Sequence, residues 1–493
     1  MNLSAHLPVL VVVVPLISAV LIPLVGRAGR SMAWAAAVAA CAASFALTLS
    51  ILRRVLSRGE IHYWLGGWQP PWGIEYVVDY LNGFVLVVVS FIALVVAVYA
   101  RKSVEAEIPE ERTSFFYCVF MLLVTGLLGI VITGDVFNLY VFIEISSLSG
   151  YALIATGRSR EALTASFNYL VLGTVAATFI LLGIGHLYMV TGTLNMADLA
   201  QRLPALYKSK VVLTAFTFLT VGLSIKVALF PLHIWMPNAY ANAPSSVSSM
   251  LAATGTKVGA YALLRTMFTV FNVRFDMQVV PFTKILLVVS AVAIVAGSVL
   301  AIAQRDIRRM LAYSSVGQIG YIVIGAAVAR QTAMAGSLLH ILNHALMKGA
   351  LFMSAGIILY STGKRNIDEL AGLGRRMPFT MAAFTIAALS MIGVPLTVGF
   401  VSKWYLSVGA LEAGMWYVVP VILLSSLLTA VYFWRVIERI YFAETEDEGP
   451  AGEPLGLVVP TGVMAGLCVY FGVFASGPYS VAYKAAGMLL GRM

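Results

Sequence analysis

The chain has 493 residues, of which 60% are apolar and only 11% are charged. This composition excludes an ordinary soluble domain and indicates a protein whose core lies in a lipid bilayer. The net charge of +10 does not indicate nucleic-acid binding, because the basic residues are spread over many short links and form no cluster on a soluble face.

A helix needs about 20 consecutive apolar residues to span the hydrocarbon core. Fourteen segments meet this condition, so we predict an all-α polytopic membrane protein with about 14 transmembrane helices. The first segment has no basic leader and no small-residue cleavage site, and we expect a retained helix there. In chain order the segments are 7–26, 32–52, 81–100, 114–133, 135–155, 165–190, 211–230, 244–270, 280–302, 306–328, 334–360, 379–402, 415–443 and 455–476.

The basic residues in the links predict an orientation with both termini outside, because inner links collect Lys and Arg. With that orientation the outer links hold the smaller set, Arg53, Arg54, Arg58, Arg202, Lys208, Lys210, Arg274 and Arg330. The inner links hold the larger set, Arg27, Arg30, Arg101, Lys102, Arg112, Arg158, Arg160, Arg305, Arg308, Arg309, Lys364, Arg365, Arg375 and Arg376. We place the protein in a prokaryotic plasma membrane.

Two polar links have a distinctive composition. Residues 53–79 are rich in Trp, Gly and Pro, which predicts an ordered outer hairpin with aromatic rings at the headgroup level. Glu75 and Asp79, at its end, could attract cations, but we expect them in a solvated loop. Residues 444–454 predict an acidic turn on the inner side.

The seventh and twelfth predicted helices both contain helix breakers next to a lysine. Lys226 precedes Pro231 by five residues, and Gly393 and Pro395 precede Lys403. Interrupted helices at matching positions indicate an inverted-repeat transporter, although proline is also common in ordinary membrane helices. We therefore predict two inverted five-helix repeats, helices 4–8 and 9–13, with helices 7 and 12 broken.

This repeat divides the chain into four parts. They are 1–113 with helices 1–3 and the hairpin, 114–270 with the first repeat, 280–443 with the second repeat, and 444–493 with the acidic loop and helix 14.

Seven ionisable side chains fall inside predicted spans, where each charge costs about 2.5–3.5 kcal/mol on insertion scales. We expect them to face the interior of the bundle and to act as a proton or cation relay. They are Glu144, Lys226, Lys257, His340, His344, Lys348 and Lys403.

The first two members are predicted to pair. Glu144 lies near the middle of the fifth helix, and Lys226 beside the break in the seventh helix is its expected partner. A lysine next to a break can move between Glu144 and a further site. The alternative is a purely structural ion pair between two helices.

Lys257 lies about 13 residues into the eighth helix, among the small or polar residues Thr254, Gly255, Thr256 and Gly259. These neighbours leave room for water around the amine. The alternative is a snorkelling lysine, whose side chain extends to the membrane surface. The depth of Lys257 in its helix makes this difficult.

His340, His344 and Lys348 recur every four residues on the eleventh helix. Each step rises about 6 Å, so the three groups form a stripe about 12 Å long. Such a stripe can conduct protons, because imidazole titrates near neutrality. The alternatives are hydrogen-bonded core histidines, with Asn343 and Ser337 as partners, or a zinc site, for which the helix offers no acidic third ligand.

Lys403, at the second break, is expected to end the relay, with Glu412 as a neighbour. The alternative for Lys403 is a snorkelling lysine at a helix end, with its amine at the membrane surface.

No cofactor is expected. The chain has neither a GK[ST] phosphate loop nor a GxGxxG motif after a strand, and its three cysteines are far apart. Energy must therefore come from an ion gradient or from a partner subunit, and we expect no enzymatic chemistry in this chain.

Four segments resemble the antiporter-like subunits shared by Mrp-type cation/proton antiporters and respiratory complex I. The likeness extends over roughly residues 75–440 and is greatest to the Mrp D subunit and its relatives in membrane-bound hydrogenases. The segments are SIKVALFPLHIWMPNAYANAPSSVSSMLAATGTKVGAYALLR, DIRRMLAYSSVGQIGYI, HILNHALMKGALFMSAG and GVPLTVGFVSKWYL.

The resemblance implies a hydrophilic axis along the membrane midplane and gives each residue of the relay a counterpart. Glu144 matches the helix-5 glutamate, Lys226 the broken-helix lysine and Lys257 the bridging lysine. His340, His344 and Lys348 match the helix-11 relay, and Lys403 matches the terminal lysine, which is a glutamate in some relatives. The absence of a long lateral helix suggests the short, D-like class.

Two functions follow as expectations. The first is a D-type subunit of a multisubunit Na⁺/H⁺ antiporter, with partners like the Mrp A, B, C, E, F and G subunits. The alternative is a proton-pumping subunit of a redox-driven complex, related to complex I or to a membrane-bound hydrogenase. A structural scaffold without transport is disfavoured by the buried charges.

Overall fold

The computed structural model describes residues 3–157, 159–444 and 451–491. Arg158, one of the basic residues expected on the inner side, and residues 445–450 of the acidic turn lie outside the described residues.

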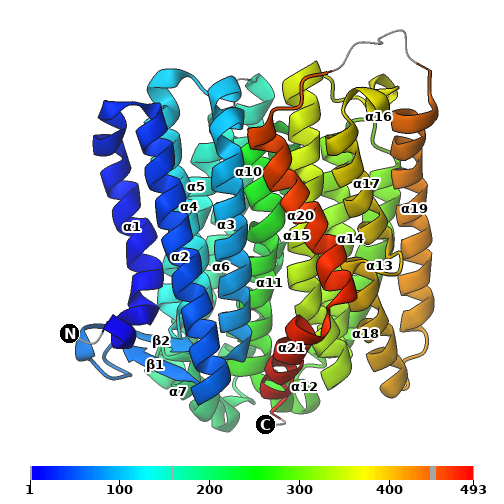
Figure 1. Ribbon diagram of the computed structural model, residues 1–493. Helices are drawn as coiled ribbons and strands as arrows, with labels where there is room; N and C mark the ends of the chain where they lie inside the picture. The colour runs from blue at the N-terminus through cyan, green and yellow to red at the C-terminus, as the bar shows by residue number, and fades with distance from the viewer. Residues whose placement is uncertain (1–2, 158, 445–450, 492–493) are drawn as a thin grey trace.

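The described chain forms a bundle of long helices that run side by side (Figure 1). Twelve of its helices are long and apolar enough to cross a membrane. The helices are α1 (Leu7–Val25), α2 (Arg30–Arg58), α3 (Tyr80–Glu107), α4 (Thr113–Ile132), α5 (Val136–Ala155), α6 (Arg160–Thr191), α7 (Met196–Arg202), α8 (Lys210–Val227), α9 (Trp235–Asn242), α10 (Ser245–Met250), α11 (Thr256–Arg265), α12 (Asn272–Gln278), α13 (Phe282–Ile302), α14 (Ile307–Ala327), α15 (Gln331–Thr362), α16 (Leu373–Arg376), α17 (Pro378–Ile392), α18 (Val398–Glu412), α19 (Val418–Phe442), α20 (Leu455–Val473) and α21 (Ser476–Leu489).

The predicted all-α membrane fold is confirmed. The two expected spans outside those twelve are the ones that the structure divides into shorter pieces. Residues 244–270 form α10, the π-helical turn η6 (Leu251–Gly255), α11 and a second π-helical turn, η7 (Thr266–Val270). Residues 379–402 form α17 and the start of α18. The division at η6 was not expected, and neither was α21 beyond the fourteenth span.

Both predicted breaks are present. α8 ends at Val227 and is followed by Ala228 in the left-handed conformation, at φ 59°. α17 ends at Ile392 and is followed by Gly393 at φ 94°. A left-handed residue stops a helix and leaves its last carbonyl groups without partners inside the helix.

The two halves repeat one arrangement of caps. Asp135 pairs with Asn195 in an isolated bridge and Asp306 pairs with Asn366 in another, and each Asp caps the helix after it. α7, which follows the first bridge, lies at the lower end of the bundle in Figure 1, whereas α16, which follows the second, lies at the upper end. The repeated motif is therefore inverted across the bundle.

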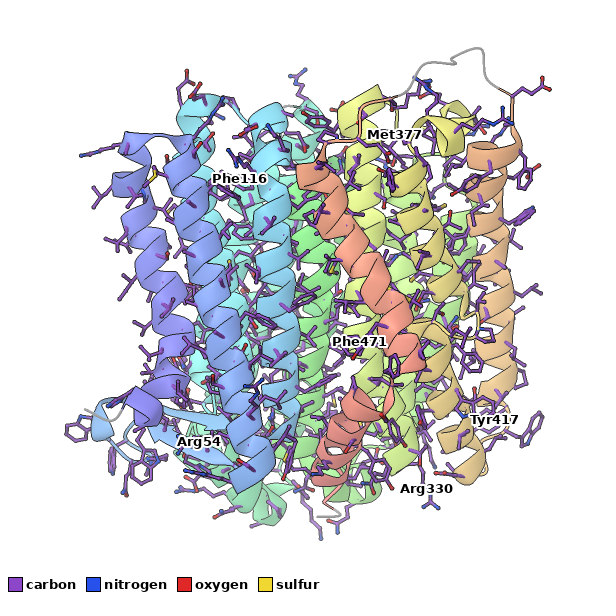
Figure 2. All side chains as sticks on the ribbon, viewed as in Figure 1. Arg54, Phe116, Arg330, Met377, Tyr417 and Phe471 are labelled. Atoms are coloured by element: carbon purple, nitrogen blue, oxygen red, sulfur yellow. The ribbon has the colours of Figure 1, made fainter. Side chains whose placement is uncertain are left out.

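Both ends of the described chain lie at the lower end of the bundle in Figure 1. Arg54 and Arg330, both predicted outside, lie at that same end, and Met377 lies at the opposite end (Figure 2). Following the predicted orientation, we call the lower end outer and the upper end inner.

The link after α2 contains the expected hairpin, with β1 (Ile61–Trp64) antiparallel to β2 (Glu75–Val78). The expectation of a solvated loop was wrong for the acidic residues near its end. Glu75 and Asp79 are buried, because Glu75 accepts hydrogen bonds from Trp64 and Asn195, and Asp79 caps α3 and pairs with Arg265.

Candidate functional site

The first pair of the predicted relay lies between α5 and α8. The Lys226 ammonium is 3.5 Å from Glu144 Oε1 and donates a hydrogen bond to Ser147 Oγ, at 2.8 Å. The Lys226 side chain is 8% exposed, whereas that of Glu144 is 28% exposed. Glu144 therefore lies at the edge of the bundle and Lys226 lies inside it.

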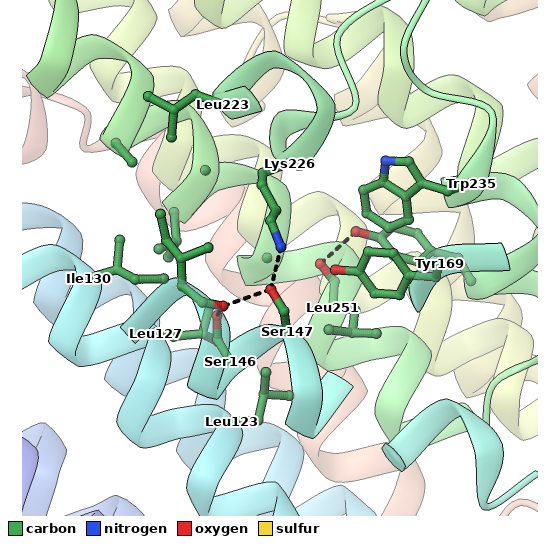
Figure 3. Close-up of a pocket in the computed structure, with 16 residues that line it drawn as sticks. Leu123, Leu127, Ile130, Ser146, Ser147, Tyr169, Leu223, Lys226, Trp235 and Leu251 are labelled. Carbon is green, nitrogen blue, oxygen red and sulfur yellow. Dashed lines mark hydrogen bonds between the residues drawn. The ribbon is translucent and has the colours of Figure 1, made fainter. Parts of the chain in front are cut away.

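Lys226 faces a small cavity, drawn in Figure 3. The cavity has a volume of about 40 Å³ and is lined by Ser147, Tyr169, Gly255 and Gly259, among others. A water molecule needs roughly 10–15 Å³ measured in this way, so the cavity accommodates water. Because Gly255 and Gly259 flank Lys257 in sequence, the cavity extends from Lys226 towards the α11 helix.

Lys257 is 1% exposed and donates a hydrogen bond to the carbonyl of Ala252, within η6. A π-helical turn replaces the usual i→i−4 pairing and frees carbonyl groups for other donors. The local irregularity therefore provides an acceptor for an amine that has no carboxylate bonded to it among the described residues.

The stripe on α15 is completely buried. Lys348 donates to the carbonyl of Leu311, at 2.6 Å, and to Ser314 on α14. The rings of His340 and His344 stack with centroids 5.7 Å apart and 13° between their planes. Neither ring nitrogen of His344 has a hydrogen-bond partner within the described chain.

His340 is held at both ring nitrogens. Nε2 lies 3.0 Å from the amide oxygen of Gln318, and Nδ1 lies 2.8 Å from Ser402 Oγ. An amide oxygen only accepts, so the neutral ring carries its proton on Nε2, and Nδ1 accepts from the serine hydroxyl. This contact with Ser402 connects α15 to α18.

Lys403, the residue after Ser402, lies at the second break and is 6% exposed. Its ammonium donates to the carbonyls of Met391 and Ile392 and to Ser426 Oγ, each at 2.9 Å. The same group lies 5.1 Å from the centre of the Tyr321 ring, a cation–π geometry. The carbonyls are those left free where α17 stops.

The structure thus arranges the predicted residues in one series that begins with Glu144 at the edge of the bundle and continues through buried side chains. Lys257 interacts electrostatically with His344 and with Lys348, and His340 with Lys403. The cavity, rather than a direct hydrogen bond, connects Lys226 with the region of Lys257. The burial of Lys257 and Lys403 removes the alternative of lysines that reach the membrane surface.

No group of three His, Cys, Asp or Glu side chains in the described ranges could hold a metal ion. The two α15 histidines therefore lack the further ligands that a zinc site requires.

Several contacts were not predicted from the sequence. Ser147, Tyr321, Ser402 and Ser426 each touch a relay residue on another helix, so no spacing within one helix indicates them. Arg308, which the sequence placed in an inner link with other basic residues, is also buried and only 1% exposed.

The family model for "NADH:quinone oxidoreductase/Mrp antiporter, TM" matches residues 133–429. NADH-quinone oxidoreductase subunit N of Desulforudis audaxviator is 49% identical over 452 residues, which cover 92% of this chain and 89% of the relative. The D subunit of the Na⁺/H⁺ antiporter of Bacillus subtilis is 30% identical, over 96% of this chain and 94% of the relative. The expected family is confirmed, but identity to this oxidoreductase protein exceeds identity to this antiporter protein.

A solved structure of the membrane-bound sulfane sulfur reductase, an archaeal respiratory membrane complex, contains a similar chain. It superposes with a TM-score of 0.92 at 31% identity, covering 98% of both chains. This chain therefore belongs to the NADH:quinone oxidoreductase/Mrp antiporter family and is an antiporter-like, multi-pass membrane subunit.

Proposed function

We propose that this chain is the proton-translocating subunit of a redox-driven membrane complex, in which it moves protons while partner subunits carry electrons. The observation that carries proton translocation is the buried series from Glu144 to Lys403. The 49% identity to an oxidoreductase subunit and the match to a respiratory complex support the redox-driven class.

In this mechanism the Glu144–Lys226 pair controls the first transfer. Protonation of Glu144 removes the negative charge that holds the Lys226 ammonium near α5. Lys226 then gives its proton to water in the cavity, and the water passes it to Lys257. The Ser147 hydroxyl, which accepts from the same ammonium, keeps Lys226 at the mouth of the cavity.

The later transfers follow the α15 stripe. A positive charge on Lys257 repels a positive charge on His344 or Lys348. A proton that arrives at Lys257 therefore favours the release of a proton from the next group in the series. His340 accepts on Nδ1 only after Ser402 turns its hydroxyl away, and it releases from Nε2. Lys403 ends the series, where carbonyls stabilise its ammonium without neutralising it.

The second candidate function is a D-type subunit of a monovalent cation/proton antiporter. It is supported by the 30% identity to the Bacillus subtilis antiporter protein over nearly the whole chain. In either function we propose a prokaryotic plasma-membrane location with both termini outside, and several membrane subunits as partners. We also propose the division into 1–113, 114–270, 280–443 and 444–493.

Inverted vesicles from cells that express the complete gene cluster test both candidates. Acidification of the vesicle interior on addition of an electron donor supports the redox-driven complex. Proton movement that follows Na⁺, K⁺ or Li⁺ without a donor supports the antiporter instead.

The same vesicles test the relay. Lys226→Ala and Glu144→Gln should abolish coupled proton transport while the complex still assembles. Lys102→Ala, which removes a half-exposed lysine that pairs with Glu105 at the surface, should leave transport unchanged. Normal transport in both relay variants would disprove the proposed function.

A further inference from the structure

A second group of buried polar side chains lies at the inner end of the bundle, beyond the relay. It is formed where α3, α10, α14 and α15 meet, and these helices pack on one another in pairs. We call it the inner polar cluster, and its members are Ser103, Glu107, Ser245, Ser246 and Arg308.

Arg308 is the central member of this cluster. Its guanidinium donates through Nη2 to the carbonyl of Ala243, at 2.7 Å, and to Ser248 Oγ. Nε and Nη1 have no hydrogen-bond partner in the described part of the chain, although both atoms are buried. Buried charged donors are rarely left without acceptors, and ordered water is the usual partner when the protein provides none.

Two serine hydroxyls in the cluster share this property. Oγ of Ser245 and Oγ of Ser246 are buried and have no partner among the residues described. α10 lies directly against α15 here, because a Cβ on Gly356 would come within 2.8 Å of Ser245 Cβ. Four unpaired polar atoms, two on α14 and two on α10, favour ordered water as their partner.

The cluster extends from the inner surface to the relay. Glu107, which is partly exposed, accepts from Ser103 Oγ at 2.7 Å and from the backbone N–H of Ser245 at 2.9 Å. Arg308 lies one turn before Leu311, whose carbonyl accepts from Lys348. Three residues of helix rise about 4.5 Å, so Arg308 and the Lys348 contact are separated by one helical turn.

We propose that the inner polar cluster is the hydrated path by which protons from the inner side reach Lys348. Glu107 takes a proton from bulk water at the surface, and it gives this proton to water beside Ser245 and Ser246. Hydrogen-bond rearrangement along the water carries a proton to the neutral Lys348 amine, which becomes an ammonium. Arg308 is a positioning residue that orients the water. This inference rests on the proposed function.

Glu107→Gln provides the first test, because the amide oxygen still accepts from Ser245 N–H but the side chain no longer takes up a proton. In inverted vesicles of the intact complex we expect coupled proton uptake to fall about tenfold. Glu107→Asp, which titrates, should restore most of it. Glu105→Gln, on the same helix and paired at the surface with Arg101 and Lys102, should have no effect.

Ser246 gives a second test, because its hydroxyl is buried and unpaired among the residues described. Ser246→Thr and Ser246→Val have the same shape, but only threonine keeps a hydroxyl to hold water. The valine variant should transport about tenfold more slowly than the threonine variant at equal assembly.

Two outcomes would overturn the inner path. One is wild-type transport in Glu107→Gln, and the other is equal transport in the Ser246→Thr and Ser246→Val variants. Lys226→Ala in the same vesicles separates the two proposals. If that variant is inactive while Glu107→Gln is normal, only the inner path fails, whereas an active Lys226→Ala disproves the relay itself.

Discussion

The buried lysines of this protein are held mainly by neutral oxygen atoms. Lys257, Lys348 and Lys403 bind carbonyl and hydroxyl groups, and only Lys226 has a carboxylate close by, at 3.5 Å. A carbonyl stabilises an ammonium without fixing its charge by a full ion pair. The amines of Lys257, Lys348 and Lys403 can therefore gain and lose a proton without breaking a salt bridge.

Ser147→Ala tests how far Lys226 depends on such an oxygen. The serine hydroxyl, 2.8 Å from the ammonium, is nearer than the Glu144 carboxylate. A hydrogen bond to a charged group contributes about 1.5–3 kcal/mol, so we expect coupled transport to slow roughly tenfold or more. Ser147→Thr, which keeps the hydroxyl, should remain near the wild-type rate. Equal rates for the alanine and threonine variants would mean that the hydroxyl does not position Lys226.

At the scale of elements, irregular points in the helices provide the acceptors. The η6 turn supplies the carbonyl for Lys257, and the end of α17 supplies those for Lys403. Regular helices bond their carbonyls internally, so the carbonyl acceptors of Lys257 and Lys403 depend on places where that pairing fails.

A buried ion pair fixes the outer end of the first repeat. Arg265 Nη2 lies 2.7 Å from Asp79 Oδ2, and its Nε donates to Tyr261, which in turn donates to the Val131 carbonyl on α4. The two charged side chains are only 8% and 4% exposed. This network connects α3, α4 and α11.

Arg265→Met should lower the free energy of unfolding by about 3–5 kcal/mol, because it leaves Asp79 charged, buried and unpaired. The midpoint of thermal unfolding of the purified complex measures this loss. The double variant Arg265→Met/Asp79→Asn should recover most of it, because asparagine still caps α3 and carries no charge. A double variant no more stable than the single one would contradict this account.

The close approach of α6 and α8 requires a glycine one turn before Lys226. A Cβ on Gly222 would lie 2.7 Å from the Ala176 carbonyl oxygen on α6. Gly222→Ala should therefore separate the helices, cost about 1–3 kcal/mol and displace Lys226 from Ser147.

Gly185→Ala on α6 is the matched control, since its Cβ would meet nothing within 4 Å. Thermal unfolding and proton flux, measured together, should fall for Gly222→Ala and not for Gly185→Ala. Equal behaviour of the two variants would show that the contact is not required.

At the scale of the whole molecule, a helix break recurs in each half of the chain, after α8 and after α17. Many large apolar side chains on α6, α13 and α19 remain exposed, as expected for faces that meet lipid or neighbouring subunits. The amines of Lys226, Lys257, Lys348 and Lys403 are instead buried inside the bundle.

Single cysteines at the two ends of α2 test the orientation of the bundle. Ser31 and Ser57 are both exposed and lie near opposite ends of this helix. With the native Cys41, Cys118 and Cys468 replaced by alanine, Ser57→Cys should react with an impermeant maleimide in right-side-out cells. Ser31→Cys should react only in inverted vesicles, and the reverse pattern would place both termini inside.

The sequence by itself determined the spans, the two breaks and the seven ionisable residues that we propose as a relay. Each depends on information within one segment: a run of about 20 apolar residues, a Pro or Gly beside Lys226 and Lys403, and a four-residue spacing on one helix. The family could also be recognised, because these segments keep their order along the chain.

Only the tertiary structure decided which side chains meet. The contacts of Lys226 with Ser147 and of His340 with Ser402 join different helices, and the pattern of one helix does not determine its neighbours. The burial of Asp79 and Arg308 was missed for the same reason. A charged residue near the end of a span is expected in water, unless another helix covers it and supplies its partners.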